Sequence, residues 1–124
     1  MTPIVIDGEP ALSVETFGRH GGKPFIIDAD RWPEVVESWG ARWTVMTTGT
    51  GHFYVASARK QATQAATRRR AHCPLAYLAR LLTSADEDEV VGFVNGNPFD
   101  MRVSNMELLT RAEVLWRHSN RLTA

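Results

Sequence analysis

The sequence predicts an α+β protein in which a small antiparallel sheet packed with helices is followed by a ββα unit. Two observations lead to this prediction. In the first half of the chain, short runs of β-branched and aromatic residues alternate with turns that contain glycine and proline. The segment Val90–Arg121 then contains two short apolar runs separated by a polar loop and followed by a helix start signal. A length of 124 residues is enough for one domain with its own core.

The strands expected before the ββα unit are runs of β-branched and aromatic residues that end at turn signals. They lead up to a β-hairpin and a third strand that would complete an antiparallel sheet. In chain order these strands are Pro3–Asp7, Ala11–Phe17 (after a turn at Gly8, Glu9 and Pro10), Phe25–Asp28, Arg42–Thr48, His52–Lys60 and a strand around Ala65–His72.

Two helices are expected among these strands. Asp30 as the N-cap, with Pro33 in the first turn, predicts a helix that ends at Gly40. Its core-facing residues are expected to be Val35, Val36 and Trp39. Pro74 predicts the start of a second helix, Leu75–Leu82, whose leucines form a buried stripe.

The ββα unit is expected to consist of two strands, Val90–Val94 and Met106–Leu109, and a helix. Asn95 to Pro98 form a cluster of turn residues after the first strand. Thr110 and Glu113 have the spacing of a capping box, which marks the start of the helix.

Charge is distributed unevenly along a chain whose formal net charge is zero. Residues 41–82 contain seven basic side chains and no acidic one, whereas residues 1–40 contain seven acids and three bases. Four acidic residues follow in a row at Asp86–Glu89. The long stretch without a carboxylate predicts a locally positive surface, which favours a polyanion as the partner.

The polar residues of the ββα segment occur in a characteristic order. They read N-G-N at 95–97, D-x-R at 100–102, S-N-M at 104–106 and T-x-x-E at 110–113. This order resembles the phage and bacterial HNH endonucleases of the His-Me finger group, which read roughly (D/H)-H-x-N-G-(D/N), D-N-R, (S/E)-N-L and T-x-x-(E/Q)-N. The resemblance implies a nuclease scaffold that uses a histidine general base on its first strand and a bound metal ion.

The catalytic residues of that pattern are missing from this chain. Gly92 and Phe93 stand where the family has its acid–histidine pair, Met101 is the middle residue of the D-N-R triplet, and Val114 replaces the helix asparagine. Phenylalanine cannot accept a proton, and neither glycine nor valine offers a side-chain oxygen to a metal. Loss of the general base alone typically costs about 10²–10⁴-fold in rate. We therefore expect a scaffold without nuclease chemistry, with no catalytic residue, no metal and no cofactor.

A second resemblance lies before the ββα segment. The pieces PFIIDADRWPEV, ARWTVMT and GHFYVASARK follow the order in which many HNH homing-type nucleases carry F-x-I-D-x-x-D-W/Y-x-x-V, W-x-V and G-Y-V-x-A-x-R. The sheet in this module is similar to that of AP2-type DNA-binding domains, which lies in the major groove. We expect a single domain, residues 1–124, that begins with an N-terminal strand or hairpin and a loop (1–23). The resemblance, which covers about Pro24 to Asn120, implies an AP2-like sheet with flanking helices (24–82) and the ββα unit (90–121).

These features favour a protein that binds double-stranded DNA on a catalytically inactive HNH-like scaffold, as a transcriptional regulator or a phage factor. The residues expected to contact DNA are Arg42, Thr44, Tyr54, Arg59, Lys60, Arg68, Arg69, Arg70, Arg80, Arg111 and Arg117. The residues expected to tie the loop of the ββα unit through side-chain-to-backbone bonds are Asn95, Asn97, Asp100, Arg102 and Asn105.

Two other functions stay open at this point. An active metal-dependent nuclease would use a different histidine as its base, either His118 or His72. Either His72 or Ala79 corresponds to the His-Arg motif that the family has at its strand-to-helix junction. A protein-interaction module or inhibitor would instead use the acidic edge at Asp86–Glu89.

Three smaller expectations complete the sequence analysis. The single cysteine, Cys73, excludes an internal disulfide and a cysteine-based zinc cluster within one chain. The chain has no apolar run of membrane-spanning length and no basic signal region in Met1–Pro10, so a cytoplasmic location without membrane contact is expected. A homodimer would double the contacts with DNA.

Overall fold

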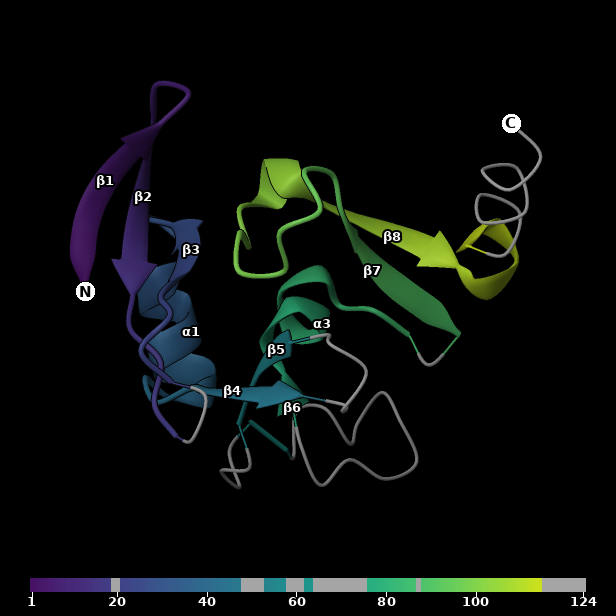
Figure 1. The fold of residues 1–124 in the computed structure, drawn as a ribbon, viewed down its shortest axis with the longest axis horizontal. Coiled ribbons are helices and arrows are strands. Elements are labelled where there is room, and N and C mark those ends of the chain that lie inside the picture. The colour runs from purple at the N-terminus through teal and green to yellow at the C-terminus, as the bar shows by residue number, and fades with distance from the viewer. Residues whose placement is uncertain (19–20, 48–52, 58–61, 64–75, 87, 115–124) are drawn as a thin grey trace.

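In the residues that the computed structural model describes (1–18, 21–47, 53–57, 62–63, 76–86 and 88–114), three small antiparallel sheets and short helices form an α+β fold. This is the predicted fold class. Figure 1 shows the N-terminal sheet and its helix on one side of the molecule and the last hairpin on the other. The middle sheet lies below them in this view.

The N-terminal sheet contains three strands in sequence order: β1 (Thr2–Ile6), β2 (Glu9–Val14) and β3 (Phe25–Asp28). Ile6 pairs with Glu9 across a two-residue turn. In this turn Asp7 and Gly8 both have positive φ, 53° and 80°, as a tight hairpin turn of the I′ type requires. The turn therefore begins one residue earlier than expected, and Pro10 belongs to β2.

Helix α1 (Trp32–Trp39) follows β3 and buries Trp32 and Val35. The prediction that Asp30 is the N-cap is wrong, because Arg31 occupies that position and makes no side-chain capping bond. Val36, expected in the core, is 39% exposed. It follows the buried Val35 by one residue, and successive helical residues point about 100° apart.

The middle sheet has the order β4 (Thr44–Thr47), β5 (Phe53–Ser57) and β6 (Ala76–Tyr77). The third strand expected around 65–72 lies outside the described residues. Ala76 and Tyr77, expected in the second helix, pair with Ser57 and Ala56 instead. Because these two residues are extended, the helix begins later than predicted, as α3 (Leu78–Thr83). Its leucines are buried as expected.

The last sheet is a hairpin of β7 (Glu89–Phe93) and β8 (Met106–Thr110), with a 3₁₀ turn η1 (Val103–Asn105) before β8. Phe93 pairs with Met106 at the loop end of the hairpin. Residues 111–114 are helical. The backbone N–H of Glu113 donates to the hydroxyl of Thr110 at 3.2 Å, which is half of the expected capping box. The order strand, loop, strand, helix is thus present.

One continuous hydrophobic core connects the described parts. Phe25 from β3, Trp43 before β4, Leu78 from α3 and Met101 from the last loop are each almost completely buried in the same cluster. Helix α3 contacts both the middle sheet and the last hairpin. No helix within the described ranges has the length and apolar character to cross a membrane.

Candidate nucleic-acid interface

The loop between β7 and β8 is held by a hydrogen-bond network of its own polar side chains. Asn105, which is 4% exposed, accepts from the backbone N–H of Asn95 at 3.0 Å. The Asn105 amide donates to the side chain of Asn95 and to the backbone carbonyl of Asp100, each at 2.9 Å. Asn95 in turn donates to the Asp100 carboxylate at 2.9 Å. At the tip, Asn97 accepts the backbone N–H of Phe99 at 3.0 Å.

Asp100 and Arg102 form a two-pronged ion pair inside this network. Arg102 donates from Nε and from a terminal nitrogen to the two carboxylate oxygens, each at 2.8 Å. The carboxylate is buried, and the hydrogen bonds from the Arg102 side chain lower the pKa of Asp100. The same bonds raise the pKa of Arg102. Arg102 also reaches Asp7, in the first hairpin, at 3.4 Å. The pair stays charged and ties the loop to the N-terminal sheet.

The loop is also joined to the free edge of β3 by backbone hydrogen bonds. Ile26 donates to the carbonyl of Phe99 at 2.7 Å and accepts from the N–H of Met101 at 2.8 Å. The Asp28 carboxylate accepts the N–H of Val103 at 2.8 Å. These bonds place Phe99 and Met101 in the shared core, where they are 4% and 1% exposed. The polar network therefore positions the ββα unit against the rest of the protein.

The four residues at which the sequence departs from the HNH pattern have different surroundings. Met101 is a core residue. Val114 lies partly exposed in the helical turn after β8, and Phe93 lies partly buried at the end of β7. At Gly92 an added Cβ would lie 3.1 Å from Leu109 Cδ1 and 3.2 Å from Glu107 Cγ, so any side chain there would require these neighbours to shift.

The described residues of the middle sheet include both buried and exposed side chains. Val55 and Ala56 point to opposite faces of β5, yet both are buried. The hydroxyl of Thr44 donates to the carbonyl of Ala56 at 3.1 Å. Tyr54, near the other end of β5, is 36% exposed and stacks edge-to-face on Tyr77. Of the described residues that were expected to contact DNA from this sheet, Tyr54 is exposed and Thr44 is partly buried, and Arg42 is exposed just before β4.

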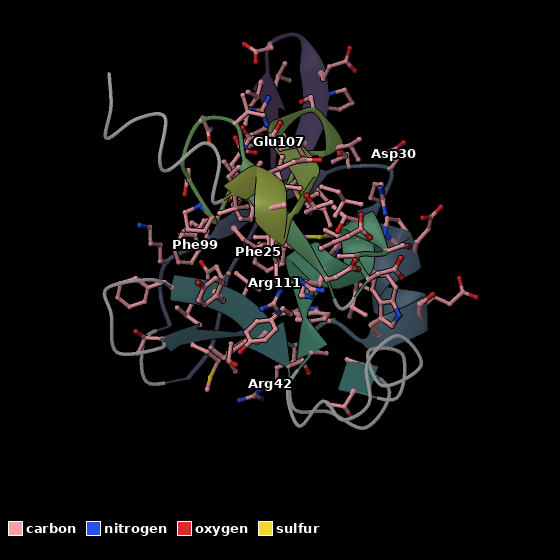
Figure 2. All side chains as sticks on the ribbon, turned by 90° about the vertical axis from the view of Figure 1, so that its right-hand side faces the viewer. Phe25, Asp30, Arg42, Phe99, Glu107 and Arg111 are labelled. Atoms are coloured by element: carbon pink, nitrogen blue, oxygen red, sulfur yellow. The ribbon has the colours of Figure 1, made fainter. Side chains whose placement is uncertain are left out.

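The described arginines of the expected DNA surface have different environments. Arg42 is exposed, and its guanidinium lies 4.7 Å from the centre of the Phe17 ring. Arg80 donates to the carbonyls of Glu89 and Asp86, and thereby holds the acidic loop before β7. Arg111 is exposed at the start of the last helix. In Figure 2 Arg42 and Arg111 lie lower in the view than the acidic Glu107 and Asp30.

Several expected site residues lie outside the described ranges, and the structure does not place them. They are Arg59, Lys60, Arg68, Arg69, Arg70 and Arg117, together with the alternative bases His72 and His118. Within the described part of the chain, no group of three or more His, Cys, Asp or Glu side chains is arranged to hold a metal ion.

A feature that the sequence analysis missed is a groove between β5 and the β7–β8 hairpin. It consists of two adjoining cavities of about 300 and 420 Å³, which share Tyr54, Val91, Phe93 and Pro98 as lining residues. We call it the sheet–hairpin groove. The sequence indicates this groove only through the two adjacent aromatic residues at 53–54. The groove itself forms by contact between segments that are distant in the sequence, which no local pattern predicts.

Comparison of the chain with protein-family models, with curated proteins and with solved structures finds no match.

Proposed function

We propose that the protein binds double-stranded DNA on an HNH-like ββα scaffold and does not cut it. The observation that carries the DNA-binding part is the exposed Arg42 side chain, stacked on Phe17 at the start of the acid-free segment 41–82. An aromatic ring beneath a guanidinium restricts its conformations, which lowers the entropic cost of a phosphate contact. The planar guanidinium fits the geometry of a phosphate.

The second part of the proposal concerns the missing chemistry. In the proposed resemblance, Phe93 stands at the position of the histidine base, and its side chain lines the sheet–hairpin groove. The neighbouring Gly92 has no side chain, and an acidic residue there would require the side chains of Leu109 and Glu107 to shift. A hydrolytic reaction needs a group that deprotonates water near the phosphate. These surroundings favour binding without hydrolysis, in the role of a transcriptional regulator or phage factor in the cytoplasm.

Fluorescence anisotropy with a labelled duplex at low salt tests the binding. The wild-type protein is expected to bind, with an affinity that falls steeply as salt increases. Arg42→Ala should weaken binding and reduce the slope of log K against log salt by about 0.9, the value for one lost phosphate contact. Arg42→Lys is the matched control, because it keeps the charge and therefore most of the slope. An absence of duplex binding at low salt would overturn the proposal.

A further inference from the structure

The sheet–hairpin groove has aromatic side chains on both walls. Tyr54 and Tyr77 come from the middle sheet, with their rings edge-to-face and 5.6 Å apart between centres. Phe93 comes from β7 on the opposite wall and borders both cavities. Phe53, which is 39% exposed, extends the aromatic lining into the second cavity.

The charge of the described lining is positive. Lys23 lines the second cavity, with its ammonium 4.6 Å from the centre of the Phe99 ring. Arg80, whose guanidinium donates to the carbonyls of Glu89 and Asp86, lines the first. No carboxylate occurs among the described residues that line either cavity. The groove therefore suits a ligand with a flat apolar ring system and an attached negative charge.

We propose that the sheet–hairpin groove holds one unpaired nucleotide of the bound DNA, with its base against Tyr54 and Phe93 and its phosphate near Lys23. This inference rests on the proposed function and adds to it a preference for DNA that contains an unpaired base. A base exposes its faces only when it leaves the duplex stack, and stacking on aromatic side chains is the common way in which proteins hold such a base.

The size and chemistry of the groove favour this occupant. Its two cavities are at the lower end of the range of about 300–1,000 Å³ that is usual for small-ligand sites. Such a space accepts one nucleotide and excludes a duplex. A purely apolar peptide would contact the aromatic walls but would offer no anionic group to Lys23.

The test uses the full-length protein and two duplexes of equal length, one fully paired and one with a single unpaired 2-aminopurine. Anisotropy gives the affinity for each duplex, and 2-aminopurine emission reports the environment of the unpaired base. We expect the wild-type protein to prefer the bulged duplex and to change the emission. Tyr54→Leu should reduce that preference by about 5- to 150-fold, the range for loss of one stacking ring. Where the wild-type preference is smaller than this, Tyr54→Leu should abolish it.

Two controls separate stacking from folding. Tyr54→Phe retains the ring and should retain the preference, whereas Phe17→Leu removes an exposed ring outside the groove and should change both affinities equally. Thermal unfolding should show that each variant is folded. Equal wild-type affinity for the two duplexes with unchanged emission would overturn the inference and leave DNA binding intact. An unchanged preference in Tyr54→Leu would also overturn the inference and leave DNA binding intact. That result is expected if the groove binds a protein instead of a base. Failure to bind either duplex would instead overturn the proposed function.

Discussion

The loop at 95–105 and the end of strand β7 belong to the same hairpin but differ in chemistry. The loop has polar residues in an order that resembles the HNH pattern, and each of Asn95, Asp100 and Asn105 has at least two hydrogen bonds within it. The strand end has Gly92 and Phe93 where that pattern has an acid and a histidine. The hydrogen-bonded polar residues of this hairpin are therefore concentrated in the loop, whereas the strand end is apolar.

This contrast predicts that the loop network carries much more of the stability than the apolar strand end. The largest effect is expected for Asp100→Ala. The substitution leaves Arg102 and Asn95 without their carboxylate in a buried setting, and breaking a buried ion pair typically costs about 3–5 kcal/mol. Urea denaturation measures this free energy of unfolding. Asp30→Ala, at an exposed carboxylate, is the control and should change it by less than about 0.5 kcal/mol.

A smaller loss is expected for Asn105→Ala, which removes an uncharged member of the network. The substitution leaves the backbone N–H of Asn95 and the buried carbonyl of Asp100 without their partner, and an unsatisfied buried group costs about 1–3 kcal/mol. Asn97→Ala removes one bond at the exposed loop tip and should cost about 1 kcal/mol. Equal losses for the two variants in urea denaturation would contradict a network centred on the buried residues.

The ion pair also predicts a dependence of stability on pH. The pKa of Asp100 is lowered from its ordinary value of 3.8 in the folded protein, because Arg102 donates to its carboxylate. The unfolded chain therefore binds the proton first as the pH falls. The stabilisation is fully present above pH 3.8 and is lost as the pH falls through the lowered pKa. Urea denaturation of wild type and Asp100→Asn should give a difference that shrinks on acidification; a constant difference would argue against the charged pair.

The smallest effect on stability is expected at the strand end. Phe93→Leu keeps a partly buried apolar side chain at the wall of the groove, and such a swap usually costs less than about 1.5 kcal/mol. Its free energy of unfolding should therefore remain closer to the wild-type value than that of either Asp100→Ala or Asn105→Ala. A loss as large as that of Asp100→Ala would mean that the two regions do not differ as proposed.

The sequence predicted local features better than tertiary ones. The strand Phe25–Asp28 has the predicted boundaries, and the Thr110 cap forms as its spacing predicts, because both depend on neighbouring residues. The local pattern predicts a helix at Ala76 and Tyr77, because no local signal shows that they pair with a strand some twenty residues earlier. The sequence also gives no local signal for the attachment of the last loop to Ile26 or for the groove, because both depend on contacts between distant segments. The periodicity of a single segment does not encode such contacts.

We propose that this scaffold binds DNA without cutting it. An agarose gel of supercoiled plasmid with increasing protein, in the presence of Mg²⁺ or Mn²⁺, measures both properties together. We predict a progressive shift of the supercoiled band, with no conversion to the nicked form after the protein is removed. Metal-dependent nicking that is abolished by His118→Ala or His72→Ala would contradict the claim and identify an active nuclease with a different base. Nicking that neither substitution abolishes would contradict it equally, as would the absence of a shift.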